Sequence, residues 1–142
     1  NESMVLEPGQ KTQSFELQSR DGKCWKIGLS VCYDLRFAEL YQQLQADLLL
    51  VPAAFTFTTG KAHWETLLKA RAIENLAYVV ASAQGGEHPN GRKTFGHSML
   101  INPWGEVLNS LELGIAVCTA DLDFDLIQAK RSQLPVLEHR VL

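Results

Sequence analysis

Residues 28–40 read Gly-Leu-Ser-Val-Cys-Tyr-Asp-Leu-Arg-Phe-Ala-Glu-Leu, an apolar run that changes to a helical pattern at Cys32. The residues from Trp25 to Val31 have the apolar character of a strand. Asp34 is a residue type that caps helices well. After it, apolar residues recur every three or four positions, as on one face of an amphipathic helix: Phe37, Leu40, Tyr41 and Leu44. We therefore expect a strand, a turn at Cys32 and a helix in immediate succession.

The rest of the chain continues this alternation of strands and helices. Phe15 and Leu17 alternate with polar residues, and the turn pair Asp21-Gly22 joins them to the strand before Cys32 as a hairpin. The other expected elements are a buried strand at 48–51, a Thr-rich loop at 55–60, a helix at 62–76, a strand at 78–83, a loop at 85–91, strands at 97–102, 107–108 and 114–119, and a last helix at 124–134 capped by Asp123. This order predicts a layered α/β fold, with residues 1–142 in a single domain.

Composition excludes several classes of protein. The chain is 46% hydrophobic and 20% charged with a net charge of −3, and no run of basic residues indicates a nucleic-acid or membrane surface. No apolar stretch is long enough to span a bilayer. Cys24, Cys32 and Cys118 are scattered, without the spacing of a metal site, so we expect no metal and no cofactor. Three unpaired thiols fit a reducing compartment, and we expect a cytoplasmic protein.

Cys32 is the strongest candidate for chemistry. A thiol at a helix N-terminus is near partial positive charge and free N–H groups, which favour the reactive thiolate. The N–H groups that follow could also bind an oxyanion on an attacked carbonyl. The alternative is that Cys32 is a small buried apolar side chain, as we expect for Cys24 and Cys118.

Further segments accompany residues 28–40 in a fixed order. They are 52–55 with 59–65, then 71–75, then 96–98 with 102–105, and finally 133–136. Together they resemble the nitrilase (carbon–nitrogen hydrolase) superfamily along nearly the whole chain. Within it, the likeness is greatest to the amidases that cleave deaminated glutathione, and next to the omega-amidases. The resemblance implies the C-terminal part of an α-β-β-α sandwich, and a hydrolase that cleaves a linear amide through a cysteine thioester.

The resemblance also implies roles for individual residues. Cys32 is the expected nucleophile, the backbone N–H of Tyr33 an oxyanion donor, and Glu2 a second carboxylate. Phe55 and Thr58 follow a predicted strand end, where α/β sheets usually contact ligands, so we expect them in the wall of a substrate pocket. The alternative is that Phe55 is a side chain of the core. The implied partner is a small-molecule amide, and the complete protein is expected to form a homo-oligomer.

Two residues of the implied machinery have no match. The family's Glu base and its Lys, which stabilises the tetrahedral intermediate, both precede the segment that matches Asn1-Glu2-Ser3. We therefore expect an N-terminally incomplete hydrolase domain that is inactive alone, or one completed by another chain. The rival hypothesis is a truncated, non-catalytic remnant that acts at most as a binding or scaffold chain.

Other charged residues have a simpler interpretation. Arg36 with Glu39 and Arg71 with Glu74 have the i, i+3 spacing of intrahelical pairs. We interpret both as structural ion pairs rather than substrate contacts. A papain-like mechanism, with His63 or His97 as base for Cys32, is a weaker third hypothesis.

Overall fold

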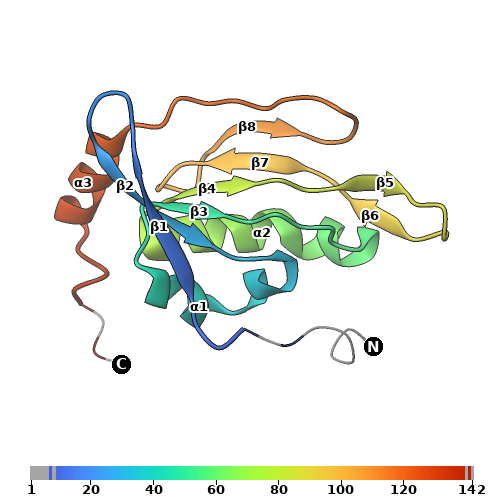
Figure 1. Cartoon of the computed structure of the whole chain (residues 1–142), viewed down its shortest axis with the longest axis horizontal. Coiled ribbons are helices and arrows are strands. Elements are labelled where there is room, and N and C mark those ends of the chain that lie inside the picture. The colour runs from blue at the N-terminus through green and yellow to red at the C-terminus, as the bar shows by residue number, and fades with distance from the viewer. Residues whose placement is uncertain (1–6, 8, 140, 142) are drawn as a thin grey trace.

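A computed structural model describes residue 7, residues 9–139 and residue 141. A six-stranded mixed sheet in the order β1-β2-β3-β4-β7-β8 forms its centre (Figure 1). The elements are β1 (Gln13–Gln18), β2 (Cys24–Leu29), the 3-10 helix η2 (Cys32–Arg36), α1 (Ala38–Leu44), β3 (Leu48–Leu50), α2 (Phe57–Asn75), β4 (Tyr78–Ala81), β5 (Gly85–Glu87), β6 (Lys93–Phe95), β7 (Ser98–Ile101), β8 (Val107–Leu111) and α3 (Phe124–Gln133).

The first half of the sheet has the topology expected from the sequence. β1 and β2 form the antiparallel hairpin, with Phe15 opposite Ile27. β2, β3 and β4 run parallel, so that Ile27 pairs with Leu48 and Leu48 with Tyr78. The helices between these strands supply the crossover that a parallel pair requires. The carboxyl ends of β2 and β3, after which Cys32 and Phe55 follow, therefore lie at the same edge of the sheet.

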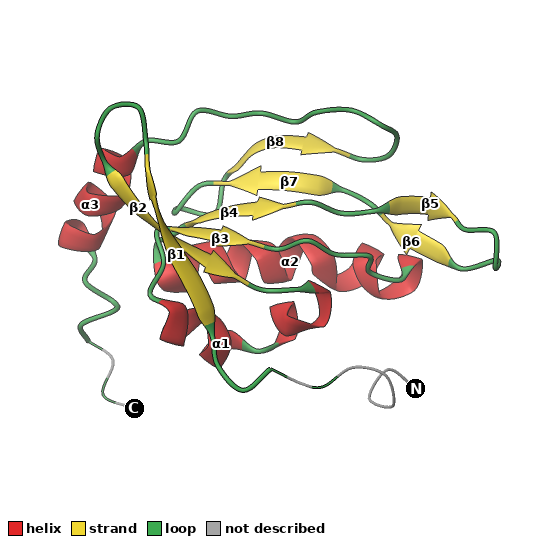
Figure 2. Cartoon of the chain, in the orientation of Figure 1, coloured by secondary structure: helices red, strands yellow, loops and turns green. Residues whose placement is uncertain are grey.

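The two faces of the sheet are covered by different helices (Figure 2). On one face, Leu49 and Val79 pack with side chains of α1 and α2, including Tyr41, Trp64 and Leu68, in the larger core. On the other face, a smaller cluster contains Trp25, Ile27, Tyr78 and, from α3, Ile127. The mixed α/β architecture predicted from the sequence is confirmed.

The start of α3 also follows the prediction. The carboxylate of Asp123 accepts hydrogen bonds from the backbone N–H groups of Asp125 (2.9 Å) and Leu126 (3.3 Å), as an N-cap does. Arg131 near the other end of α3 binds the Asp47 carboxylate at 2.7 Å and so ties the helix to the sheet.

The first correction concerns the helix expected directly after Cys32. The chain forms a short 3-10 helix, η2, and then an extended residue, Phe37 (φ −107°, ψ 96°), before α1 begins. The apolar spacing of residues 37–44 is the same whether the helix begins at Cys32 or at Ala38, so the pattern does not reveal the break at Phe37. The macrodipole of a long helix is therefore not available at Cys32.

The second correction concerns the Thr-rich loop expected at residues 55–60. α2 begins at Phe57, five residues before the predicted start. Thr56 is its N-cap residue, and Thr58 and Thr59 lie in its first turn. β-branched and glycine residues have low helix propensity, but burial of the face around Gly60 and Trp64 outweighs it here.

Two further corrections concern strands. A loop is expected at residues 85–91, yet β5 and β6 pair as a short antiparallel hairpin that begins at Gly85. A strand is expected at residues 114–119, and none is assigned there within the described chain. Ile115 and Val117 alternate as a strand requires but are 108% and 89% exposed. Among the described residues, no backbone hydrogen bond joins this segment to β8.

Candidate active site

The backbone of Cys32 is left-handed. Its φ is +49°, a conformation that residues other than glycine rarely adopt and that costs about 1–3 kcal/mol. The N–H of Cys32 donates to the carbonyl of Pro52, which follows β3, at 2.8 Å. The thiol is unpaired and partly exposed. A strained residue between a buried strand and a helical turn is the geometry of a nucleophile elbow.

The residues before Cys32 are fixed by hydrogen bonds to β3 and α1. Ser30 donates both its N–H (3.2 Å) and its hydroxyl (3.0 Å) to the carbonyl of Leu50. The buried Tyr41 hydroxyl donates to the Ser30 hydroxyl at 2.8 Å. Burial raises the pKa of Tyr41 to about 12, because the ionised phenolate cannot be solvated there.

The residues after Cys32 are fixed by η2 itself and by α2. The Asp34 carboxylate accepts the N–H of Val31 at 2.8 Å. Arg71 of α2, only 4% exposed, donates two N–H groups to the carbonyl of Leu35, from Nε at 3.1 Å and Nη2 at 2.9 Å. Its Nη1 binds Glu74 at 3.0 Å, which confirms the predicted Arg71–Glu74 pair. The pair orients the guanidinium of Arg71 against the elbow.

The backbone N–H of Tyr33 is available for an acceptor. The N–H groups on either side are engaged, that of Cys32 with Pro52 and that of Asp34 with Val31. Among the backbone hydrogen bonds of the described residues, none has the Tyr33 N–H as its donor. An unengaged N–H in a rigid turn beside a thiol can stabilise negative charge on an attacked carbonyl.

A hollow of about 250 Å³ opens beside the thiol. Its lining comes from the elbow, the segment after β3, the start of α2 and the β5–β6 hairpin: Cys32, Tyr33, Arg36, Ala54, Phe55, Thr56, Thr59 and Arg92. Cys32 and Phe55 therefore lie at the same end of the sheet, as expected. Thr58 is exposed in the first turn of α2 and does not line the hollow, whereas Thr56 and Thr59 do.

Arg36 is placed differently from the prediction. The extended residue Phe37 separates it from the helix that carries Glu39, and no ion pair between Arg36 and Glu39 is found in the described residues. Instead, its guanidinium lies 5.4 Å from the ring centre of Phe55 and 5.6 Å from that of Tyr33, in the wall of the hollow. The guanidinium of Arg36 can therefore contact a molecule in the hollow. The sequence favours an ion pair over this role.

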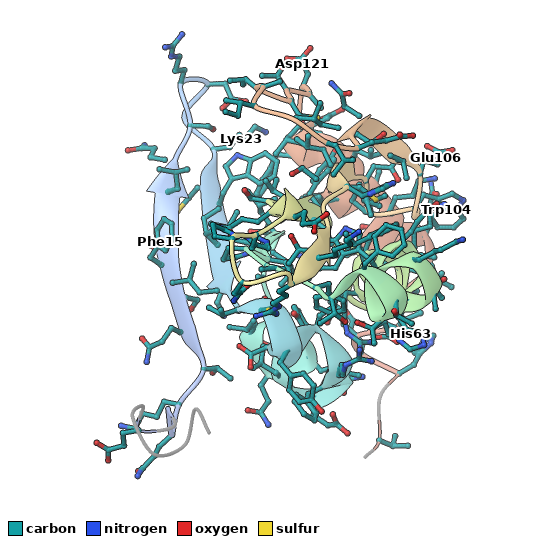
Figure 3. The ribbon with its side chains drawn as sticks, turned by 90° about the vertical axis from the view of Figure 1, so that its right-hand side faces the viewer. Phe15, Lys23, His63, Trp104, Glu106 and Asp121 are labelled. Carbon is teal, nitrogen blue, oxygen red and sulfur yellow. The ribbon has the colours of Figure 1, made fainter. Side chains whose placement is uncertain are left out.

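The two candidate histidine bases lie elsewhere. His63 is exposed on α2 (Figure 3), with its Nδ1 3.4 Å from Arg36. His97 stacks on Phe95, and its Nδ1 is 2.9 Å from the Phe95 carbonyl oxygen. Neither lines the hollow beside Cys32. Glu2 lies outside the described residues. Within the part of the chain that is described, no group of His, Cys, Asp and Glu side chains could hold a metal ion.

The chain matches the carbon-nitrogen hydrolase family model over residues 1–132. It belongs to the carbon–nitrogen hydrolase family. A deaminated glutathione amidase from Dictyostelium discoideum is 47% identical over 146 residues, which cover 100% of this chain and 48% of that protein.

Solved structures of nitrilase-superfamily proteins have the same fold. One is a member of branch 10 of the superfamily from Saccharomyces cerevisiae, with a TM-score of 0.85, 30% identity, and coverage of 99% of this chain and 51% of the other. Another is a superfamily protein from Xanthomonas campestris that has an arsenic adduct in its active site. Its TM-score is 0.88 and its identity 28%, with coverage of 100% of this chain and 55% of the other. This carbon–nitrogen hydrolase chain spans about half the length of these relatives.

Sequence reasoning missed several residues of the hollow. Arg92 precedes β6 of a hairpin where the sequence predicts a loop, and Thr56 and Thr59 stand around a helix start instead of in a loop. The only sequence signal for Arg92 is a lone arginine in a Gly- and Asn-rich segment, which indicates a turn and not a site.

No helix among the described residues combines the length and apolarity needed to cross a bilayer.

Proposed function

We propose that the protein containing this chain is an amidase of the deaminated-glutathione type, in which Cys32 is the nucleophile. The observation that supports this best is the strained Cys32, held by hydrogen bonds on both sides at the edge of a hollow, inside the segment that carries the family motif. The amidase relatives give the reaction class, and a small linear amide is the proposed substrate.

In the proposed reaction, the Cys32 sulfur attacks the carbonyl carbon of the amide. A C–S bond forms, the oxygen becomes an oxyanion, and the N–H of Tyr33 donates to it. The C–N bond then breaks, the nitrogen takes a proton and leaves as ammonia or an amine, and a thioester remains. Water adds its hydroxyl to the thioester carbonyl, which releases the acid and returns the proton to the thiol.

The proton transfers in this scheme need a general base, and no residue in the motifs of residues 1–142 corresponds to the family's base. The family resemblance assigns them to a Glu base and assigns part of the oxyanion stabilisation to a Lys. Glu2 is proposed as a second carboxylate on the same resemblance alone. Phe55 is proposed as an apolar wall for the substrate, because it is only 7% exposed and lines the hollow.

The thioester provides the test. The native protein, rapidly quenched during turnover of a linear amide, should carry an acyl mass on the peptide that contains Cys32, and hydroxylamine should release it as a hydroxamate. Cys32→Ser should lose hydrolysis by at least about 10³-fold, whereas Cys24→Ser and Cys118→Ser should retain it. Hydrolysis that persists in Cys32→Ser would show that the protein uses another nucleophile.

A further inference from the structure

The β5–β6 hairpin closes through a tight turn over residues 88–91, His-Pro-Asn-Gly. The N–H of Gly91 donates to the carbonyl of His88 at 2.8 Å, and the N–H of His88 donates to the carbonyl of Arg92 at 2.8 Å. Gly91 has a φ of +78°, the conformation of the bulge residue that follows a type I turn in a hairpin loop. The turn is therefore ordered, and it places the side chain of Asn90 directly before a glycine.

The peptide group between Asn90 and Gly91 is accessible to water. Both residues are exposed, and a Cβ on Gly91 would meet no atom beyond its chain neighbours within 4 Å. Because glycine has no side chain, nothing shields its nitrogen from the carboxamide of the residue before it. That carboxamide is also polarised, since its Oδ1 accepts the N–H of Arg92 at 3.1 Å. A donor to a carbonyl oxygen stabilises the negative charge that develops there when the carbon is attacked.

The other asparagines of the described chain lack this combination. Asn75 is only 2% exposed and lies at the end of α2. Asn102 precedes Pro103, whose nitrogen carries no proton. Asn109 lies in β8, where its Nδ2 donates to the carbonyl of Thr119 at 2.8 Å. Among the described residues, the turn of the β5–β6 hairpin is thus the place where an exposed carboxamide faces an unhindered peptide nitrogen.

We propose that Asn90 is a site of spontaneous deamidation, a covalent change of the protein itself that does not depend on the proposed amidase activity. The nitrogen of Gly91 loses its proton to water or hydroxide and attacks Cγ of Asn90. The new C–N bond closes a succinimide ring, the bond from Cγ to the side-chain nitrogen breaks, and that nitrogen takes a proton from water and leaves as ammonia. Water then adds to one of the two ring carbonyls and opens the ring. The net reaction consumes one water and releases one ammonia, without oxidation or reduction.

The two ways of opening the ring give different backbones. Cleavage of the bond from the Gly91 nitrogen to Cγ leaves an aspartate with the ordinary main chain. Cleavage of the bond from that nitrogen to the main-chain carbonyl carbon of residue 90 leaves an isoaspartate, whose main chain runs through Cγ and contains an additional carbon. An aspartate can keep the hydrogen bond to the N–H of Arg92. The additional carbon of an isoaspartate displaces Gly91 from His88 and so breaks the turn.

Loss of the turn has a consequence for Arg92. Its guanidinium donates through Nη2 to the carbonyl of Ala54 at 3.2 Å, and this bond ties the hairpin to the segment after β3. The strand pairs on both sides of the turn remain, with Glu87 opposite Lys93 and their side chains 3.2 Å apart. We therefore expect isoaspartate to open the chain locally around Arg92 and to leave the hairpin paired.

The native turn also slows the reaction. While the N–H of Gly91 is bound to His88, its nitrogen is not available to attack Cγ, so this hydrogen bond must open first. Exposed turns open locally at a much lower free energy than the whole domain unfolds. Pro89 restrains the opening, because its ring fixes one backbone dihedral. Deamidation should therefore be slower in the fold than in the unfolded chain, and faster in a variant with a looser turn.

The first experiment follows the native protein during incubation in mildly alkaline buffer made with oxygen-18 water. Peptide mapping should find the mass of an amide-to-acid conversion, with the heavy oxygen incorporated, on the peptide that contains Asn90, as two separable products. The rate should exceed the rates at Asn75, Asn102 and Asn109 by at least about tenfold. Digestion in ordinary water distinguishes this conversion from any that occurs while the peptides are prepared.

Two variants test the role of the turn. Pro89→Ala keeps the Asn-Gly pair in a looser turn and should accelerate the conversion by about two- to fivefold. Asn90→Ser removes the carboxamide, while its hydroxyl can still accept the N–H of Arg92, and it should show no conversion at residue 90. The time course of the native protein stands on its own if either variant fails to fold.

Trypsin measures the loss of the turn. Cleavage after Arg92 should be about tenfold faster in aged protein enriched in isoaspartate than in unaged protein, because cleavage needs a locally open chain. Asn90→Asp, which has the charge of the product without the additional carbon, is the matched control and should be cleaved at the unaged rate.

The outcomes decide each step. If Asn90 stays unchanged in the native protein while the same protein in guanidinium chloride is converted, the turn protects the site and the proposal is wrong. Equal rates at all asparagines would also overturn it, since the turn would then have no part in the reaction. Conversion with an unchanged rate of cleavage after Arg92 would show that isoaspartate does not open the turn.

Discussion

At the scale of single residues, the conformation of Cys32 is fixed by hydrogen bonds on both sides of its turn. The carbonyl of Pro52 holds the N–H of Cys32, and the carbonyl of Leu35 is held by Arg71, so the left-handed residue is clamped from both directions. A clamped turn presents the thiol and the Tyr33 N–H in one fixed geometry. Preorganisation of this kind lowers the reorganisation needed when charge develops during a reaction.

We expect Cys32 to be alkylated in preference to the other two thiols. Partial desolvation and the neighbouring Glu16 carboxylate raise the pKa of the Cys24 thiol, which reduces its thiolate fraction. Peptide mapping of the folded protein after limiting iodoacetamide should find most of the label on Cys32. The same mapping in denaturant is the control and should label all three cysteines alike. Equal labelling in the folded protein would contradict an activated Cys32.

Tyr41 predicts a specific loss of stability at high pH. Because its pKa in the fold is about 12, against about 10 in an unfolded chain, the folded state holds its proton more tightly. The free energy of unfolding should therefore be insensitive to Tyr41 below pH 10 and fall by about 2–3 kcal/mol as the pH rises from 10 to 12. Urea unfolding at several pH values measures this slope.

The control for this prediction is Tyr41→Phe. At pH 7 it should be about 1 kcal/mol less stable, since the hydrogen bond to Ser30 is lost. Between pH 10 and 12 the difference should shrink and reverse, because Phe has no proton to lose. Parallel curves for the two proteins over that range would show that the buried phenol does not control alkaline unfolding.

At the scale of elements, α2 supports η2 through Arg71. Arg71→Met keeps a similar side-chain volume but leaves the carbonyl of Leu35 without its donors. We expect a loss of about 2–4 kcal/mol in the free energy of unfolding, together with slower alkylation of Cys32 in the protein that remains folded. Urea denaturation and alkylation kinetics measure the two effects.

Arg71→Lys distinguishes the orienting role from charge alone. A lysine keeps the positive charge but cannot reach the Leu35 carbonyl and Glu74 with a rigid fork of donors. We expect it to recover part of the stability and little of the alkylation rate. Full recovery of both by lysine would mean that any cation at this position is sufficient.

The elements that the sequence predicts correctly are those whose pattern and partners are local. The hairpin at Asp21-Gly22 and the N-cap at Asp123 are predictable because a turn pair or a cap residue specifies them directly. The parallel pairing of β2 and β3 follows from the helix between them. The position of Cys32 in the turn after β2 follows from the pattern around it, although its left-handed φ is not visible there.

Other elements depend on contacts distant in the sequence. β5 contains Gly85 and Gly86, which have low strand propensity, and it pairs with β6, which is anchored to the carbonyl of Phe55. Residues 114–119 have the alternation of a strand but form no ladder with β8 among the described residues. Arg36 lies away from its expected partner because Phe37 breaks the helix. Single-sequence patterns do not contain this information.

At the scale of the whole molecule, apolar surface remains open on the described chain. β1 forms one margin of the molecule (Figure 3), and its Phe15 and Leu17 are 45% and 51% exposed. The segment beside β8, tied to it by a hydrogen bond from Asn109 to the carbonyl of Thr119, exposes Ile115 and Val117 almost completely. Unpaired edges with exposed apolar side chains, here at β1 and beside β8, favour association, and the relatives are about twice as long as this chain.

We therefore expect a protein made of residues 1–142 alone to associate and not to turn over amides. Loss of the family's Lys would remove a strong electrostatic contact, which typically costs about 10²–10³ in rate. Loss of the Glu base would cost roughly a further 10²–10⁴, although such effects within one catalytic unit need not multiply. Light scattering and an amidase assay on the purified 142-residue chain measure both properties.

Addition of the family's Glu base and Lys from a second chain is the decisive comparison. Co-expression of residues 1–142 with the N-terminal segment of a deaminated glutathione amidase should cover the exposed strands, reduce association and restore hydrolysis that depends on Cys32. The same segment with its Glu base replaced by Gln should restore solubility without activity, because it supplies the partner surface but not the proton acceptor. Robust hydrolysis by residues 1–142 alone, abolished in Cys32→Ser, would mean that a residue within this chain serves as the base and that the assignment of that role to an upstream Glu is wrong.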